Sequence, residues 1–196
     1  MGQNYYISDL HFGHTNIIRF DNRPWYTIEE MDKSLIDNWN SVVTDADTVY
    51  CLGDFCWQTE NRWIEILDQL NGNKQLIKGN HCIKSPSAKL KKKFQDIKDY
   101  KEITDDGRHV IMSHYPIMCY KASYDDKTWM LHGHTHTTRE QDFVEKWTQE
   151  LVASKVNRSD SYGHIINCGC MMPWMDYKPR TLDELIAAWE SKYNTK

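Results

Sequence analysis

The sequence predicts an α/β fold, in which strands and helices alternate along the chain and a sheet lies between helical layers. Two observations predict it. Short apolar runs that are typical of strands alternate with segments whose apolar residues follow a helical period. Polar side chains that can bind metals come directly after several of these runs, and sites in open α/β sheets form at that edge. With 196 residues, 40% of them hydrophobic, residues 1–196 are expected to form a single domain.

In the first half of the chain, a short strand at 4–8 is expected to end at Asp9. Thr27 is predicted as the N-cap of a helix that extends to about Val43, and Glu30, three residues on, would complete a capping box. Three further elements are predicted: a strand at 48–52 that ends at Gly53-Asp54, a helix at 61–70, and a strand at 75–78 that ends at Gly79-Asn80-His81.

In the second half, a basic helix is predicted at 86–94 and a strand at 101–104, followed by a turn at 105–107. Strands at 109–113 and 129–132 are expected to end at His114 and Gly133, and a last strand is expected at 165–167. A closing helix at 182–193 would be capped by Thr181. Residues 138–163 are polar and weakly patterned, which indicates an excursion with a helix at about 142–153.

Composition restricts the partners. The net charge is −4 with the nine histidines neutral, which argues against a protein that coats nucleic acid, so a nucleic-acid partner has no support from charge. A phosphate substrate is still compatible, because bound divalent cations would make a site locally positive. The sequence has no recognisable secretory signal and no stretch long and apolar enough for a membrane span, so we expect a cytoplasmic protein without membrane contacts. Its six cysteines are expected to be reduced and not to bind metal.

Five short motifs carry the candidate chemistry, and each follows a predicted strand. Asp9 and His11 are two residues apart, so they project to the same side of an extended backbone, and His134 and His136 repeat this spacing. The remaining motifs are Gly53-Asp54, Gly79-Asn80-His81 and His114. Each motif alone is most simply a turn. Together, in this order, they indicate a site for two divalent metals, and the mixture of oxygen and imidazole ligands suits manganese, iron or zinc.

The ordered set resembles the calcineurin-like metallophosphoesterase superfamily. The run His11-Phe12-Gly13-His14, with Asn22-Arg23-Pro24 after it, is similar to small single-domain members from bacteria and phages. The resemblance implies a four-layer β-sandwich of two mixed sheets flanked by helices. It also implies ligand roles: one metal would be held by Asp9, His11 and His136, the other by Asn80, His114 and His134, with Asp54 bridging them.

The resemblance further implies hydrolysis of a phosphate ester, with His81 donating a proton to the leaving oxygen. Two positions depart from the family pattern. Trp57 and Cys82 occupy places where many members carry a charged side chain, so the usual support for His81 is missing. We expect a small phosphodiester, of a nucleotide or another molecule, as substrate. A phosphomonoester of a metabolite or nucleic-acid end is the alternative, and an inactive binding scaffold is the alternative from a different class.

Several polar and aromatic residues near these motifs could contact the substrate. His14, Arg19 and Arg23 follow the first motif closely and are expected to bind substrate, although either arginine could instead be an ordinary surface residue. His132 is expected to support the metal ligands by hydrogen bonding. Four aromatic residues could either line a pocket or pack in the core: Trp25, Tyr115, Tyr120 and Trp174.

Overall fold

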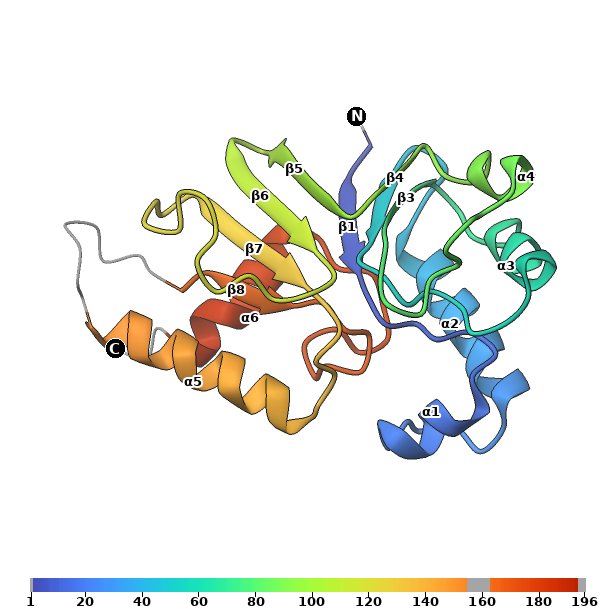
Figure 1. Ribbon diagram of the computed structural model, residues 1–196, viewed down its shortest axis with the longest axis horizontal. Coiled ribbons are helices and arrows are strands. Elements are labelled where there is room, and N and C mark those ends of the chain that lie inside the picture. Colours follow the sequence, from blue (N-terminus) through green and yellow to red (C-terminus); the bar gives the residue numbers. More distant parts are fainter. Residues whose placement is uncertain (1, 155–162, 194–196) are drawn as a thin grey trace.

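Two four-stranded sheets form the centre of the protein in the computed structural model, which describes residues 2–154 and 163–193 (Figure 1). The first sheet has the order β1 (Asn4–Ile7), β2 (Thr48–Cys51), β3 (Asn73–Ile77) and β4 (Asp96–Lys98), and these strands are parallel. The second has the order β5 (Tyr100–Asp105), β6 (Arg108–Ser113), β7 (Thr128–His132) and β8 (Ile165–Asn167). In it, β5 pairs antiparallel with β6, and the other pairs are parallel.

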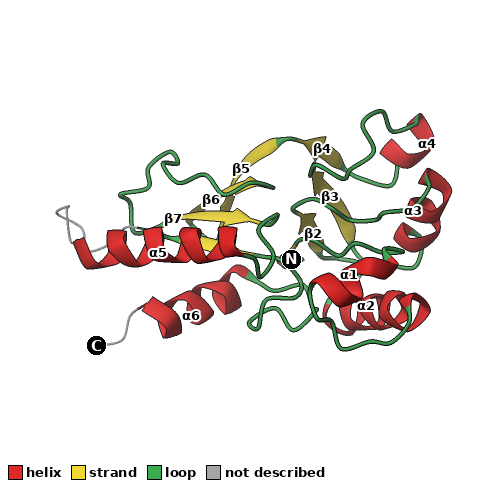
Figure 2. Ribbon diagram, turned by 60° about the horizontal axis from the view of Figure 1, so that its bottom comes forward, coloured by secondary structure: helices red, strands yellow, loops and turns green. Residues whose placement is uncertain are grey.

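Six helices flank the sheets within the described residues: α1 (Thr15–Phe20), α2 (Ile28–Val42), α3 (Glu60–Leu67), α4 (Ala88–Lys91), α5 (Arg139–Ser154) and α6 (Leu182–Tyr193). Helices α1 to α4 lie on the side of the first sheet, and α5 and α6 lie on the side of the second (Figures 1 and 2). The expected α/β sandwich of two sheets flanked by helices is therefore confirmed. In the first sheet, antiparallel pairing is limited among the described residues to an isolated bridge between Tyr6 and Arg180.

Helix α2 follows its sequence signals closely. The Thr27 side chain accepts a hydrogen bond from the Glu30 backbone N–H at 3.2 Å, as an N-cap does. The Glu30 carboxylate accepts in return from the Tyr26 N–H at 3.1 Å, one residue earlier than in the usual capping box. Met31 and Trp39 are fully buried on the face predicted to be apolar.

Some short elements differ from the prediction. Helix α1 and strand β4 were not predicted, because six and three residues are too few to show a periodicity. Helix α4 is much shorter than 86–94, since Leu90 is its one buried residue. Helix α5 is longer than 142–153 and fills most of the expected excursion, of which 155–162 lie outside the described residues.

The two sheets are joined next to the motifs. The Tyr6 hydroxyl on β1 donates to Asp105 Oδ2 on β5 at 2.6 Å, and burial of this phenol raises its pKa, so it stays a donor. A parallel bridge pairs Ser8, just after β1, with Gly169, just after β8. Backbone hydrogen bonds of 2.7 Å from Ser8 N to Cys168 O and 2.9 Å from Cys170 N to Ser8 O fix this junction. The ends of β1 and β8 are thereby held together.

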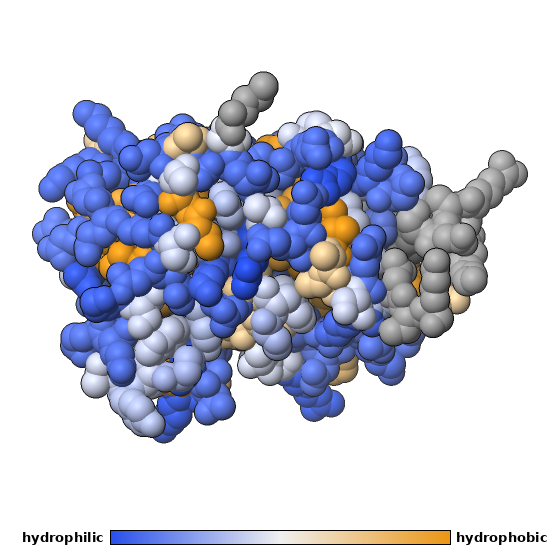
Figure 3. All heavy atoms as spheres, turned by 180° about the vertical axis from the view of Figure 1, so that it is seen from behind, coloured by the Kyte–Doolittle hydropathy of each residue, from blue (hydrophilic) through white to orange (hydrophobic). Residues whose placement is uncertain are grey.

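Within the described residues, no helix combines the length and the apolar character that a bilayer crossing requires. On the rear face, the coloured atoms in Figure 3 are mostly hydrophilic, and the orange areas are small and separated by polar residues. This face therefore presents no broad apolar patch outside the grey region.

Candidate metal centre

The candidate ligands lie where the strands of both sheets end. Because β1, β2 and β3 are parallel, Asp9, Asp54 and Asn80 leave the first sheet at one edge. Strands β6 and β7 are also parallel, so His114 and the His134 loop leave the second sheet at one edge. The structure brings both edges together, and all seven residues predicted to bind metal meet there.

One group of ligand atoms consists of Asp9, His11 and His136, whose ligand atoms lie within 4.8 Å of one another. His11 Nε2 is 3.3 Å from His136 Nε2, which in turn is 3.7 Å from Asp9 Oδ1. Two imidazole nitrogens and a carboxylate oxygen thus face a common point. These are the three residues that the resemblance assigned to the first metal.

Asp54 lies between this group and a second one. Its Oδ2 atom is 3.8 Å from His11 Nε2 and 3.5 Å from His114 Nε2. On the far side, Asn80 Oδ1 is 2.9 Å from His114 Nε2 and 3.0 Å from His134 Nδ1. Asp54 therefore has the position that a bridging carboxylate requires.

The backbone at these ligands is strained. Five of the seven have left-handed φ angles between 45° and 69°: Asp9, His11, Asp54, His134 and His136. Non-glycine residues adopt this conformation uncommonly, and such strain is concentrated at functional sites. Hydrogen bonds hold it in place here, among them His11 N to Asp54 O at 2.9 Å.

Glycines next to the ligands allow the close approach of the loops. A Cβ atom at Gly79 would overlap Asp54 Oδ1, and one at Gly133 would overlap the Ser8 hydroxyl and lie 2.5 Å from Asp9 Oδ2. The Gly-Asn-His and Gly-His-x-His patterns thus have a steric reason in this structure.

Hydrogen bonds orient two of the histidines. His114 Nδ1 lies 2.7 Å from the Leu52 carbonyl oxygen, which can only accept, so Nδ1 carries the proton and Nε2 keeps its lone pair for the centre. His136 Nδ1 lies 2.7 Å from Asp21 Oδ1 and is fixed in the same way. Although burial opposes it, this contact and the charge of Asp9 raise the pKa of His136.

Arg23 holds the backbone and the carboxylate that position two of these ligands, Asp9 and His136. Its buried guanidinium donates to Asp21 Oδ2 and, at 2.8 Å each, to the carbonyl oxygens of Leu10 and Asp9. All of these partners belong to the protein, so the geometry does not suit the substrate-binding role expected from the sequence. Arg23 instead fixes the backbone of the first motif and the carboxylate that orients His136.

Burial sets the ionisation of the centre. Burial raises the pKa of the Asp9 carboxyl and lowers the pKa of His11 and His134. Neutral imidazoles offer the lone pairs that metals need. In the described part of the chain, the ion-pair partners of Asp9 and Asp54 are histidines alone. Divalent cations would supply the positive charge that two buried carboxylates require, so the residues present fit a two-metal centre.

His81 lies at the mouth of this centre. Its backbone N–H donates to Asp54 Oδ1 at 2.9 Å, and its exposed ring lies 6.0 Å from the His11 ring. The ring also contacts the Trp57 indole, with 4.3 Å between ring centroids. Cys82, the other departure from the family pattern, places its Sγ atom 3.2 Å from Gly79 N and so helps to hold the turn.

The other residues expected to bind substrate lie around a recess of about 370 Å³ beside the first metal group. His14 lines it and stacks on Trp57. Arg19 is exposed next to it, with its guanidinium carbon 5.3 Å from the Phe20 ring centroid.

Of the aromatic residues considered from the sequence, Tyr115 reaches the centre, with its ring 4.6 Å from that of His134. His132 lies behind the same loop, with Nδ1 2.8 Å from the Gly133 carbonyl oxygen.

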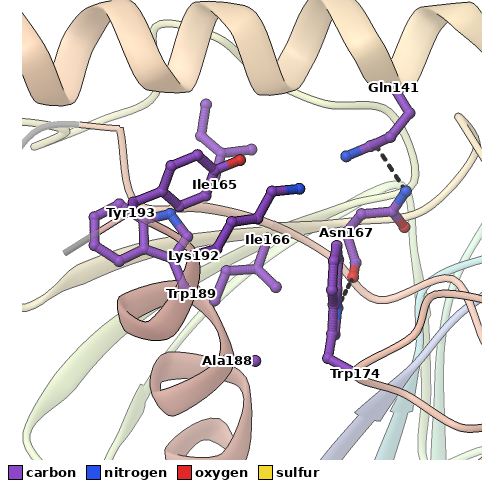
Figure 4. Close-up of a pocket in the computed structure, with 9 residues that line it drawn as sticks. All are labelled: Gln141, Ile165, Ile166, Asn167, Trp174, Ala188, Trp189, Lys192 and Tyr193. Atoms are coloured by element: carbon purple, nitrogen blue, oxygen red, sulfur yellow. Dashed lines mark hydrogen bonds between the residues drawn. The ribbon is translucent and has the colours of Figure 1, made fainter. Parts of the chain in front are cut away.

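Two residues that support the candidate ligands, Asp21 and Asn167, were not identified from the sequence. Asp21 contacts His136 across 115 positions of sequence, and no local pattern reveals such a pair. Asn167, at the end of β8, donates to the Thr135 hydroxyl, the Gln141 side chain and the His136 carbonyl oxygen. Figure 4 shows Asn167 between Gln141 of α5 and Trp174, whose indole N–H donates to its carbonyl oxygen. The one available signal was the position of Asn167 as the last residue of a predicted strand.

Comparison with known proteins identifies the family of the chain and finds a similar fold. An uncharacterized protein of Methanocaldococcus jannaschii is 39% identical over 141 residues, which are 71% of this chain and 72% of that protein. The Gene 66 protein of Mycobacterium phage L5 is 31% identical over 164 residues, 70% of this chain and 79% of its own. A solved structure of a protein of unknown function from Aquifex aeolicus has a TM-score of 0.67 and 28% identity, and the match covers 96% of this chain and 100% of the other. The profile of the calcineurin-like phosphoesterase superfamily domain matches residues 5–183, and the chain therefore belongs to that superfamily.

Proposed function

We propose that this protein hydrolyses phosphate esters with two divalent metal ions, and that phosphodiesters of nucleotides or other small molecules are its preferred substrates. The superfamily to which the chain belongs is one of phosphoesterases, and the clustered carboxylates and histidines of this chain fit divalent metals. The single observation that carries the proposal is the position of Asp54, within 4 Å of histidines of both ligand groups and hydrogen-bonded to the backbone of His81.

Some of these residues would bind the metals, and His81 would transfer a proton. Bound metals would act as Lewis acids that neutralise phosphate oxygens and activate water. Asp9, Asp54 and the neutral histidines would hold these cations, and their two carboxylates leave the centre positive overall, which favours an anionic substrate. His81, exposed at the mouth, would donate a proton to the departing ester oxygen.

The recess favours a diester over a monoester. Among the described residues that line it, none is a lysine or an arginine. Arg19 is exposed beside it, with its guanidinium near the Phe20 ring, and Arg23 is already engaged by the protein. A phosphomonoester carries a second negative charge at neutral pH and gains most from such cations. A diester has less charge and a second organic group, which suits a recess lined by Ile17, Phe20 and Trp57.

The test is metal reconstitution followed by kinetics. The purified protein is stripped with a chelator, reloaded with Mn²⁺, Fe²⁺ or Zn²⁺, and assayed with bis(nitrophenyl) phosphate and nitrophenyl phosphate. We expect no hydrolysis without metal, restored hydrolysis with at least one metal, and a higher kcat/KM for the diester. Asp54→Asn, which keeps the shape and removes the charge, should lower both metal content and activity.

Each of the other possible results of this assay would support a different function. Hydrolysis that is independent of metal would reject the proposal. A higher kcat/KM for the monoester would favour a phosphomonoesterase. Two metals bound without hydrolysis of either ester would favour the inactive binding scaffold.

A further inference from the structure

The Trp57 side chain is unusually placed for a large aromatic residue. Its side chain is 44% exposed, although tryptophan is highly buried on average. It follows Asp54 by three positions, and its backbone N–H donates to the Phe12 carbonyl oxygen at 2.9 Å. The adjacent Cys56 pairs with Phe12 in a parallel bridge. An exposed indole is therefore held rigidly at the mouth of the metal centre.

The neighbours of Trp57 fix the orientation of the indole. The His14 ring stacks on it with 4.2 Å between centroids and 10° between planes. The His81 ring lies 4.3 Å away at 52°, and the His11 ring lies 6.2 Å away. Trp57 thus contacts the proposed proton donor, lies next to a proposed metal ligand and lines the recess.

The recess has the chemistry of an aromatic subsite. Phe20 is 61% exposed beside it, with its ring 6.2 Å from that of His14 in an edge-on arrangement. Ile17 lines the same space from α1. One side of the recess, formed by Ile17, Phe20 and Trp57, is therefore apolar and aromatic, and it lies next to His81. The opposite side carries polar residues, among them Asp21, His136 and Thr138.

We propose that this recess binds a planar ring carried by the group that leaves the phosphorus, with the ring packed on Trp57. The inference rests on the proposed function, because His81 marks the side of the leaving oxygen. A group attached to that oxygen would leave beside His81, and Trp57 is the ring that lies nearest to His81 in the recess, at 4.3 Å against 6.0 Å for His11. Flat rings stack on indoles, and a nucleobase or an aryl group would satisfy the same surface.

A purely structural role for Trp57 makes a different prediction. If the indole only kept His81 in place, its loss would slow proton donation to every leaving group with the same ester chemistry. A binding role for the ring affects only substrates that carry one. The two roles are separable with substrates that share the reacting atoms and differ in the attached group.

The experiment uses two such pairs with the metal-loaded protein. One pair is bis(phenethyl) phosphate and bis(cyclohexylethyl) phosphate, which have similar leaving alcohols but differ in planarity. The other is the dithymidine phosphodiester joined through both 5′ oxygens and its abasic counterpart. Each diester is symmetric, so the leaving group is defined. Wild type should prefer the planar member of at least one pair by about 5- to 150-fold in kcat/KM, as one stacked ring contributes.

Variants identify the residue responsible. Trp57→Leu, which keeps an apolar side chain without a flat face, should abolish the preference, and Trp57→Phe should retain most of it. Trp147→Leu is the matched control, because Trp147 is also exposed, at 38%, but lies on α5 outside the lining of the recess. A preference for phenethyl as well as thymidine would indicate any flat ring, and a preference for thymidine alone would indicate a nucleobase.

The inference is overturned if wild type hydrolyses both members of each pair equally, or if Trp57→Leu lowers kcat by the same factor for both. The wild-type comparison decides the matter even if the leucine variant fails to fold. Failure of the proposed function gives a different result, because neither the pairs nor the nitrophenyl esters would then be hydrolysed by the metal-loaded protein.

Discussion

Replacing Asp21 by asparagine tests how the centre is held, because this one carboxylate orients His136 and pairs with a buried guanidinium. Its Oδ1 atom faces His136 Nδ1 at 2.7 Å, and its Oδ2 atom accepts from Arg23 at 2.9 Å. An amide has one oxygen and one donor. With the oxygen toward Arg23, the NH₂ group donates to His136 Nδ1 and moves the imidazole proton to Nε2, the nitrogen that faces the metal group. With the oxygen toward His136, the NH₂ group of the asparagine points at the Arg23 guanidinium, so two hydrogen-bond donors face each other.

The magnitude follows from these contacts. Loss of a residue that orients a metal-bound histidine commonly lowers metal affinity by about 10- to 100-fold. Weakening a hydrogen bond to a charged group costs about 1.5–3 kcal/mol, and Asp21 and Arg23 have side-chain exposures of 4% and 0%, so solvent screens little of it. We expect the free energy of unfolding of the metal-free protein to fall by about that amount. The Asp54, Asn80 and His114 group should bind its metal nearly as before.

The assay is a calorimetric metal titration of the chelator-stripped protein, with urea unfolding measured in parallel. Asp37→Asn is the matched control, because Asp37 is exposed on α2 and pairs with Lys33 one turn away. Such a surface pair contributes about 0.5 kcal/mol or less. If Asp21→Asn bound two metals as tightly as wild type and unfolded at the same urea concentration, the supporting role of Asp21 would be refuted.

Four further predictions concern other parts of the chain. His81→Ala should lower turnover about 100-fold without changing metal content, and the loss measured on alkyl esters should exceed that on nitrophenyl esters, which need little protonation. Gly133→Ala should lower metal content, as measured by elemental analysis, because its Cβ would lie 2.5 Å from a metal-site carboxylate. Hydrogen bonds from Lys121 and then Tyr100 lower the pKa of Glu102 to about 2 from 4.5, so this carboxylate stabilises the fold above pH 4.5 and the stabilisation is lost as the pH falls toward 2. Glu102→Gln should therefore cost about 1 kcal/mol in urea unfolding at pH 7 and much less at pH 2 to 3. Iodoacetamide should modify the exposed Cys119 first under native conditions, and mass spectrometry that found a disulfide would contradict the free thiols.

The sequence predicted the strands that end at ligands, because each combines an apolar run with a polar residue at a defined end. It also predicted which side chains meet at the candidate metal centre, since five motifs in a fixed order are far more specific than any one of them. Helix α2 was predictable for a local reason, because Thr27 and Glu30 cap it and its apolar residues repeat over fifteen positions. Elements as short as α1 and β4 depend on tertiary contacts and carry no such signal.

The supporting residues could not be predicted, because their roles arise from contacts between distant segments. Arg23 was expected to bind substrate because it follows the first motif, and only the fold reveals that it is buried and bonded to the carbonyl oxygens of Asp9 and Leu10. Asn167 reaches the His136 loop from 31 positions away. Periodicity and spacing describe neighbours along the chain, whereas these contacts depend on how the two sheets meet.

Trp57 shows how a departure from a family pattern can carry information. A charged side chain beside a proton-donating histidine would strongly stabilise one of its charge states, whereas an indole carries no charge. Among the described residues, no carboxylate lies within ion-pair distance of the His81 ring, whose contact at this position is Trp57 instead. The exchange removes electrostatic help from proton transfer and adds an apolar surface for the leaving group. Hydrolysis would then depend more on binding that group and less on protonating it, which favours esters whose leaving group has a flat ring and departs easily. A weaker dependence on His81 and a preference for planar leaving groups would then be two consequences of the indole at this one position, and Trp57→Leu should impair ring-bearing substrates without making His81 more important.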